Sequence, residues 1–135
     1  MAQSSPGPAT RPLSPHILIW RWHITMFCSI ANRATGVALY VGFLILAGWA
    51  VALLAGPEAY RGYTGLLGSW LGKLVLFGLA VSALYHLAAG VRHLFWDSGK
   101  GFQPRTAELT GAACLAFGVV GAVLTFVVAY FAGAF

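Results

Sequence analysis

Three long stretches without a charged side chain constrain this chain more strongly than any other feature. They cover residues 34–57, 74–91 and 109–135. A helix needs about 20 predominantly apolar residues to cross a hydrocarbon core of about 30 Å, and each stretch reaches that length with its flanking residues. Backbone polar groups in lipid must be satisfied within their own segment, so we expect three membrane-spanning helices. The predicted spans are residues 32–56, 70–96 and 107–133.

The overall composition supports the same fold class. Hydrophobic residues make up 59% of the chain and charged residues only 8%, whereas soluble domains carry about 25% charged residues. So few charges cannot cover a water-facing surface, which excludes a soluble globular domain. The net charge of +5 rests on eight basic residues, too few for a nucleic-acid-binding surface. We therefore predict an all-α integral membrane protein.

The distribution of basic residues indicates how the chain is oriented in the membrane. Six of the eight Lys and Arg residues lie before the first span or around the loop between the second and third spans. Because basic flanking residues are retained on the cytoplasmic side, we expect the N-terminus inside and the C-terminus outside. The predicted location is a bacterial inner membrane, with the C-terminus in the periplasm.

The residues before the first span are expected to form a tail and a short helix. Residues 1–12 are rich in Ser, Pro, Gly and Ala and lack a signal-peptide pattern, so we expect a flexible tail. Ser14 and Pro15 resemble a helix cap followed by proline, which predicts a short interfacial helix over residues 16–27. Residues 13–135 would then form a single three-helix membrane-anchor domain. Cys28 and Cys114 lack a CxxC spacing, and we expect free thiols.

A stripe of small residues with one histidine marks the second span. Gly78, Ser82, His86 and Gly90 follow at intervals of four, so they share one helix face. His86 lies about 9 Å along the axis from Arg92, which places the imidazole inside the hydrocarbon. A flat haem needing an axial histidine would fit such a slot. Ordinary packing of small residues, with a histidine that bonds across the interface, is the alternative, and a proton relay is a third interpretation.

A second histidine on the same helix cannot complete a haem site with the first. His93 lies about 10.5 Å along the axis from His86, and both side chains project from one helix, whereas axial ligands must face each other across the ring. A six-coordinate haem would therefore need its other ligand from a different chain. The alternative role of His93 is an interfacial polar rim that reaches water together with Arg92 and Asp97.

A second polar cluster stands at the entrance to the first span. Ser29 and Arg33 are four residues apart on one helix face, and Asn32 is adjacent. Their donors could hold the carbonyl oxygens of a quinone or stabilise negative charge on it. They could equally hold a haem propionate or a lipid phosphate. The remaining alternative is an arginine that reaches the interface beside a serine that caps the helix.

Three motifs in order resemble one known family. RPLSPHILIW (11–20), SIANRATG (29–36) and HLAAGVRHLFWD (86–97) are similar to the cytochrome b subunit of succinate dehydrogenase. Its patterns read approximately RPLSPHLxIY, SIxHRxTG and HxxxGxRHLxWD. That subunit is the larger of two small membrane anchors in succinate:ubiquinone oxidoreductase. The resemblance implies that this chain forms half of a heterodimeric anchor helix bundle.

The resemblance also implies roles for particular residues. His86 matches the axial ligand of haem b, whose opposite ligand is a histidine of the second anchor subunit. Ser29 and Arg33 match contributions to the ubiquinone pocket, which the iron–sulfur subunit and the second anchor complete. Asn32 stands where the family has a histidine; it can still form hydrogen bonds but cannot carry a positive charge. Asn32, Arg92 and His93 are the candidates for contacts with the haem propionates or the polar rim.

The implied function is electron transfer in the tricarboxylic acid cycle and aerobic respiration. The chain would be a non-dehydrogenase subunit, with succinate oxidised in a separate flavoprotein subunit and electrons passing through the iron–sulfur subunit to ubiquinone. Haem b would serve as an electron reservoir. Three alternatives compete: a fumarate reductase anchor, a structural anchor without haem, and a small proton-coupled transporter that uses His86 and His93.

Overall fold

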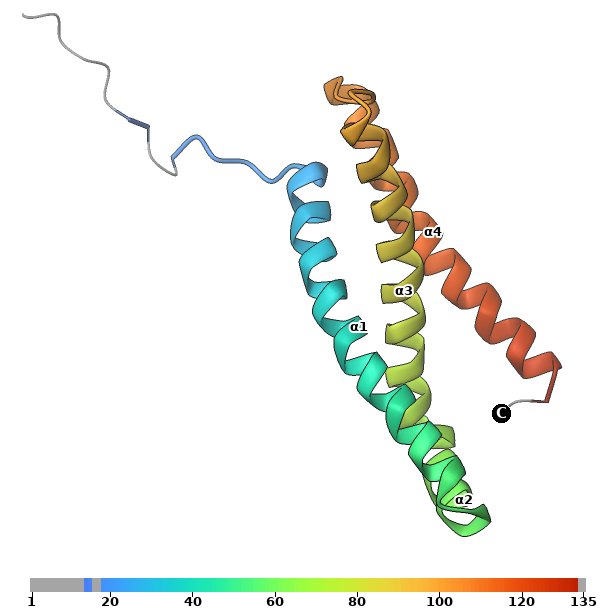
Figure 1. Cartoon of the computed structure of the whole chain (residues 1–135). Helices are drawn as coiled ribbons and strands as arrows, with labels where there is room; N and C mark the ends of the chain where they lie inside the picture. The colour runs from blue at the N-terminus through green and yellow to red at the C-terminus, as the bar shows by residue number, and fades with distance from the viewer. Residues whose placement is uncertain (1–13, 16–17, 134–135) are drawn as a thin grey trace, which may run out of the picture.

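The computed structural model describes residues 14–15 and 18–133. These residues form four helices: α1 (Ile24–Leu54), α2 (Pro57–Gly68), α3 (Trp70–Asp97) and α4 (Pro104–Phe131) (Figure 1). No strand occurs in this part of the chain. Three of the helices, α1, α3 and α4, are long and apolar enough to cross a membrane. The predicted all-α membrane fold with three spans is therefore confirmed.

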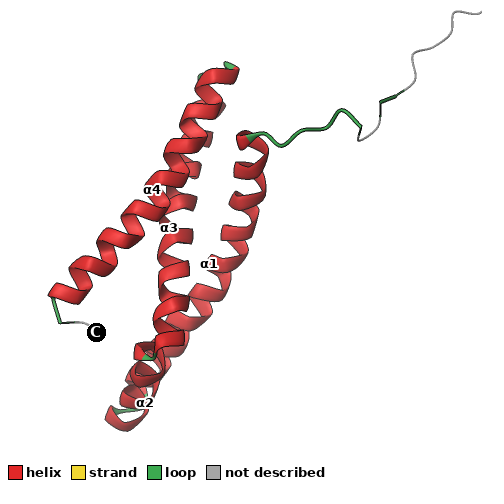
Figure 2. Ribbon diagram, turned by 180° about the vertical axis from the view of Figure 1, so that it is seen from behind, coloured by secondary structure: helices red, strands yellow, loops and turns green. Residues whose placement is uncertain are grey.

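Helix α3 is the central element of the bundle. It packs against α1, α2 and α4, and the other two long helices lie on either side of it (Figures 1 and 2). The start of α1 and the loop between α3 and α4 lie at one end of the bundle, called the loop end below. Helix α2 lies at the opposite end, called the α2 end. Each long helix therefore runs from one end of the bundle toward the other.

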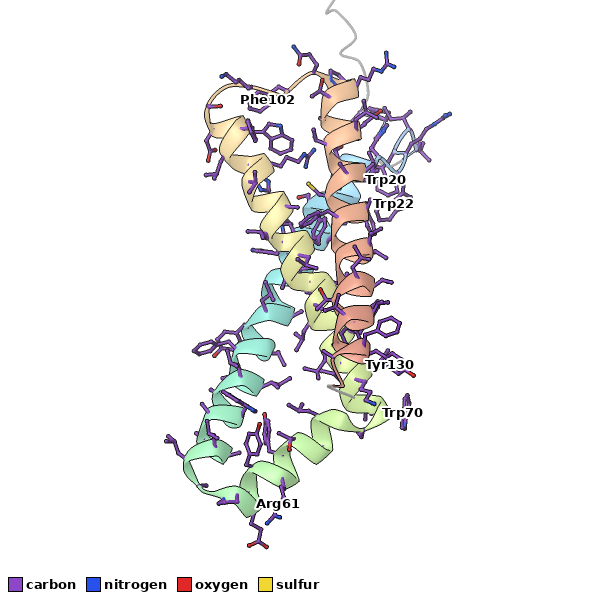
Figure 3. The ribbon with its side chains drawn as sticks, turned by 90° about the vertical axis from the view of Figure 1, so that its right-hand side faces the viewer. Trp20, Trp22, Arg61, Trp70, Phe102 and Tyr130 are labelled. Atoms are coloured by element: carbon purple, nitrogen blue, oxygen red, sulfur yellow. The ribbon has the colours of Figure 1, made fainter. Side chains whose placement is uncertain are left out.

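Aromatic side chains gather toward both ends of the bundle. Trp20, Trp22 and Phe102 lie toward the loop end, and Trp70 and Tyr130 toward the α2 end (Figure 3). The rings of Trp20 and Trp22 meet edge to face, with their centroids 5.0 Å apart. Aromatic residues prefer the two interfaces of a bilayer, so this arrangement fits a bundle that crosses the membrane.

The contact between α3 and α4 is close because α4 presents small residues to α3. At Gly118, an added Cβ would lie 2.8 Å from the Cβ of Tyr85 and 3.2 Å from its Cα. Such distances leave no room for a side chain, so the two backbones approach each other there. Small residues at interfaces allow membrane helices to pack in this way. The buried positions of α4 are Ala107, Gly111, Cys114, Gly118 and Ala122.

A sharp turn between α1 and α2 closes the α2 end. Gly56 has a φ of +107°, which favours glycine, and Pro57 occupies the first turn of α2. The Gly-Pro pair ends the first span, and it also begins a helix of 12 residues that the sequence analysis did not predict. Helix α2 folds back on α1, where the Tyr63 hydroxyl donates a hydrogen bond of 2.7 Å to the Ile45 carbonyl.

Helix α3 begins where Ser69 caps it. The Ser69 Oγ accepts a hydrogen bond of 3.1 Å from the Gly72 backbone N–H, which satisfies one of the free donors of the first turn. An added Cβ at Gly72 would collide with the carbonyl oxygens of Leu66 and Leu67, so this junction requires glycine. The observed α3 extends one residue beyond the predicted span of residues 70–96.

The start of α1 differs from the prediction. The helix begins at Ile24, eight residues before the expected 32, and the separate interfacial helix over 16–27 is not formed in its described part. Residues 18–19 form a turn, the backbone is irregular from 20 to 22, and His23 is the extended N-cap of α1. Because no Gly or Pro interrupts residues 24–35, a helix once begun continues through them. Residues 16–17 and the predicted tail lie outside the described residues.

Candidate functional site

His86 lies at the contact between α3 and α1. Its Nδ1 atom is 3.2 Å from the Thr35 hydroxyl oxygen on α1. The next residue of α1 is Gly36, where an added Cβ would lie 3.4 Å from the His86 Cε1 atom. The imidazole is thus held against one turn of α1, while its side chain stays partly exposed.

The small residues around His86 leave open space at both ends of the stripe. Gly78 and Gly90 are exposed, and a Cβ added at either would meet no described atom within 4 Å. Ser82 is buried, and its hydroxyl donates a hydrogen bond of 2.8 Å to the Gly78 carbonyl. At its two glycines, therefore, the stripe is not packed against another described helix of this chain. This openness allows a flat molecule to approach α3 beside the imidazole.

These residues fit a haem group. Axial coordination needs one ring nitrogen of a neutral histidine, while the other nitrogen is commonly held by a hydrogen-bond partner. With Nδ1 of His86 beside Thr35, Nε2 is the nitrogen left for a metal. The exposed glycines of the same face give the space that a macrocycle requires.

Ser29 and Arg33, which the sequence analysis grouped on one face of α1, have different surroundings in the structure. Ser29 lines a cavity of about 80 Å³ between α1 and α3, together with side chains of α3 that include Tyr85, His93 and Trp96. Arg33, one turn further along α1, is exposed and does not line that cavity. The structure therefore brings Ser29 and His93 together, which spacing along a single helix could not predict.

Asn32 carries a buried polar atom without a partner. Its Oδ1 atom is hidden from solvent and makes no hydrogen bond within the described part of the chain. A buried acceptor without a donor is destabilising, so most such atoms in proteins are paired. Asn32 is one turn before Gly36 on α1, so the two residues share one face of the helix. Gly36 is a residue of that face that lies against His86.

Arg92 does not reach water as the predicted polar rim requires. The side chain is only 8% exposed and turns toward α4 instead of reaching water. Its Nε donates a 3.0 Å hydrogen bond to the Thr110 hydroxyl, and its Nη2 donates a 2.8 Å bond to the Ala107 carbonyl. The guanidinium carbon lies 4.0 Å from the centre of the Trp96 ring. Arg92 thus connects α3 with α4, because burying a cation requires that its donors be satisfied.

His93, the residue after Arg92, stays partly exposed. Its ring meets that of Trp96 edge to face, with the ring centroids 5.2 Å apart. Asp97 ends α3 as an exposed residue. Both residues lie at the loop end, and their role in a polar rim stays a prediction. Both cysteines are free, as the sequence predicted, and both are buried.

The sequence analysis missed two residues of the site, Thr35 and Tyr85. The Tyr85 hydroxyl donates a hydrogen bond of 2.7 Å to the Cys28 carbonyl, which joins α3 to α1 beside the cavity at Ser29. Thr35 belongs to the motif SIANRATG, three residues after Asn32. Each contact joins two helices, and periodicity within one helix carries no signal for it.

The sequence of this chain matches the family model of the succinate dehydrogenase/fumarate reductase transmembrane subunit over residues 8–127. The chain belongs to this family. The succinate dehydrogenase cytochrome b556 subunit of Paracoccus denitrificans is 41% identical over 118 residues, 87% of this chain and 91% of the relative. That of Rickettsia felis is 37% identical over 101 residues, 75% of this chain and 78% of the relative.

A mitochondrial relative is similar to this chain at a comparable level of identity. The succinate dehydrogenase cytochrome b560 subunit of Sus scrofa is 38% identical over 120 residues, 85% of this chain and 69% of the relative. The family and these relatives support a membrane-anchor role in succinate dehydrogenase. The three apolar helices fit a multi-pass membrane subunit of that family. The resemblance seen in the three sequence motifs is confirmed.

Proposed function

We propose that this chain binds haem b through His86 and helps to pass electrons from an iron–sulfur subunit to ubiquinone. The observation that carries the proposal is the setting of His86, with Nδ1 held by α1 and open glycine positions on the same face. The relatives are named cytochrome b subunits of succinate dehydrogenase, which supports the oxidation of succinate as the physiological direction.

In this proposal the chain supplies one side of the haem site. His86 would hold the iron through Nε2, and the exposed faces of Gly78 and Gly90 would leave room for the ring. Haem, when bound, supplies storage for one electron. A second histidine ligand would come from another anchor subunit, because both histidines of α3 lie on one helix. Asn32 and His93 are the proposed polar contacts of the propionates, to which the Asn32 side-chain amide N–H and an imidazole N–H would donate. The unsatisfied Asn32 Oδ1 is an acceptor, so its partner would have to be a donor from another molecule.

The quinone is proposed to bind at the loop end of α1. The Ser29 hydroxyl would donate a hydrogen bond to a carbonyl oxygen of the head group. Arg33, an exposed cation one turn away, would orient that head group and offset negative charge as it is reduced. Two electrons and two protons convert ubiquinone to ubiquinol. The iron–sulfur subunit and the second anchor would complete the pocket, and a flavoprotein subunit would oxidise succinate.

The loop end is proposed to face the cytoplasm of a bacterial cell. Arg21 and Arg33 stand at the start of α1, and Arg92, Lys100 and Arg105 stand around the α3–α4 loop. Basic residues of short flanking segments are retained on the cytoplasmic side. This orientation presents Ser29 and Arg33 to the proposed soluble subunits.

The haem proposal is tested by a reduced-minus-oxidised absorption spectrum of the purified complex. We expect a b-type signal in the parent complex and its loss in His86→Ala. His23→Ala, which removes an exposed imidazole at the start of α1, is the matched control and should keep the signal. An unchanged spectrum in His86→Ala would remove this residue from the iron. A parent complex without haem would identify the chain as a structural anchor.

The quinone proposal is tested by comparing two electron acceptors. In Ser29→Ala and Arg33→Leu, we expect succinate-dependent reduction of ubiquinone to fall at least about tenfold, since loss of one oxyanion-type donor can lower a rate about 10²- to 10³-fold. Reduction of an artificial dye that accepts electrons from the soluble subunits should be unchanged. Equal loss with both acceptors would indicate poor assembly, and no loss with ubiquinone would place the quinone elsewhere.

A further inference from the structure

We propose that Thr35 is a positioning residue for haem: its hydroxyl oxygen accepts the Nδ1–H of His86 and so keeps Nε2 unprotonated for the iron. The inference rests on the proposed role of His86 as the axial ligand. It assigns a function to a threonine on α1, a different helix from the ligand itself.

The hydrogen-bond inventory of Thr35 decides which atom donates. A hydroxyl has one hydrogen and two lone pairs. Thr35 Oγ1 lies 2.8 Å from the Ala31 carbonyl oxygen and 3.1 Å from the Asn32 carbonyl oxygen, and both can only accept. The single hydrogen is therefore directed at these carbonyls, with the shorter contact at Ala31. A hydroxyl that instead donated to His86 would turn its lone pairs toward two carbonyl oxygens.

Both lone pairs of the Thr35 Oγ1 atom are left to accept, and one of them can accept a hydrogen from the imidazole. The Oγ1 atom is 3.2 Å from Nδ1 of His86, so the hydrogen of that contact must come from the ring. A neutral imidazole carries one hydrogen, and with that hydrogen on Nδ1 the lone pair of Nε2 is free. Iron coordination through Nε2 needs this tautomer.

The threonine is well suited to hold the ring because its own conformation is restricted. A β-branched side chain in a helix has few allowed rotamers, and the bond to the carbonyl four residues back selects one of them. Gly36 lets α1 approach the other part of the ring, at 3.4 Å from Cε1 to an added Cβ. The imidazole is thus directed by a fixed acceptor and by a close backbone, both on α1.

The hydrogen bond has a consequence for the iron. A partner on the outer nitrogen raises the basicity of a ligand histidine and orients its ring, and loss of such a partner typically weakens metal binding 10- to 100-fold. Without the Thr35 hydroxyl, His86 would donate less electron density to ferric iron. We therefore expect the haem to be retained less tightly, and its midpoint potential to shift upward.

The test compares Thr35→Val, which removes the hydroxyl and keeps the shape, with Thr35→Ser, which keeps the hydroxyl. Thr125→Val is the control, because the Thr125 hydroxyl donates a hydrogen bond to the Gly121 carbonyl of its own helix. The readouts are haem content per complex after detergent washing, the midpoint potential from a redox titration, and the electron paramagnetic resonance of ferric haem. Thr35→Val should lose haem about 10- to 100-fold more readily and shift both the potential and the resonance. Thr35→Ser and Thr125→Val should match the parent.

Parent-like haem content, potential and resonance in an assembled Thr35→Val complex would overturn the inference. If that variant does not assemble, the parent complex decides instead. Electron–nuclear double resonance of its ferric haem should detect an exchangeable proton on the outer nitrogen of the ligand from this chain, and absence of that proton would refute the inference. Failure of the proposed function looks different, since the parent would then lack haem or His86→Ala would keep it.

Discussion

The two faces of α3 differ in how completely their buried polar groups are hydrogen-bonded. Toward α4, small residues bring the backbones together at Gly118, and the donors of Arg92 bond a hydroxyl and a carbonyl of α4. Toward α1, His86 stays partly exposed, and the buried Oδ1 of Asn32 has no hydrogen-bond partner among the described residues.

This difference separates a structural contact from a ligand-binding one. A buried polar group is costly unless it is hydrogen-bonded, so unsatisfied atoms are expected where another molecule supplies the partner. The α3–α4 contact needs no such partner for Arg92. The α1–α3 contact does, at Asn32, and it also contains His86, to which we assign the haem iron. Changes at the two contacts should therefore have different consequences.

The largest effect is expected from Gly118→Leu at the α3–α4 contact. The added side chain would begin 2.8 Å from the Tyr85 Cβ, so the helices would have to separate. We expect a loss of about 3 kcal/mol of stability, the upper range for overpacking, seen as a lower unfolding temperature of the complex in detergent. Val119→Leu, at an exposed neighbour on α4, is the control. Equal stability of the two variants would show that the contact is looser than described.

A smaller loss is expected from Arg92→Met. Methionine fills a similar length but forms neither the bond to Thr110 nor the bond to Ala107. Hydrogen bonds to charged groups contribute about 1.5–3 kcal/mol, part of which is offset because the cation is no longer buried. We expect a net loss of about 2 kcal/mol in the same thermal assay. Arg105→Met changes an exposed arginine of α4 and should have almost no effect; an equal effect would contradict the role of Arg92.

The smallest effect on stability is expected from Asn32→Leu at the α1–α3 contact. No hydrogen bond of the buried Oδ1 is lost, and replacing an unsatisfied polar group with an apolar one of similar size is nearly neutral. We expect a change of less than about 1 kcal/mol in the thermal assay, together with weaker haem retention or a shifted haem spectrum. A large loss of stability with an unchanged spectrum would make Asn32 a structural residue and remove the contrast between the two faces.

The sequence predicted helix bounds well where the charge-free length of one helix defines them. The second span was predicted within one residue of α3, because charge-free length and flanking basic residues define a membrane helix. The start of α1 was missed by eight residues, since Ser29, Asn32 and Arg33 lower the hydropathy of a helix that continues past them. Helix α2 was missed because its 12 residues are amphipathic and too short to span a membrane.

The candidate site divides in the same way. The stripe around His86 and the polar motif around Ser29 were recognisable from spacing, because residues on one helix face follow a fixed period. The burial of Arg92 was not, since an arginine near the end of a span ordinarily reaches water. Its actual position depends on Thr110 and Ala107, which belong to another helix.

The amino-acid sequence alone determined the fold class, the three spans, the motifs of the family and the helix face that carries His86. These properties depend on local composition and helical period, which act within one segment. Only the tertiary structure decided that Arg92 joins α3 to α4, that Ser29 and His93 share a cavity, and that Thr35 meets His86. Those contacts depend on how closely and in which register two helices approach, and that is set by their small residues together, not by either helix alone.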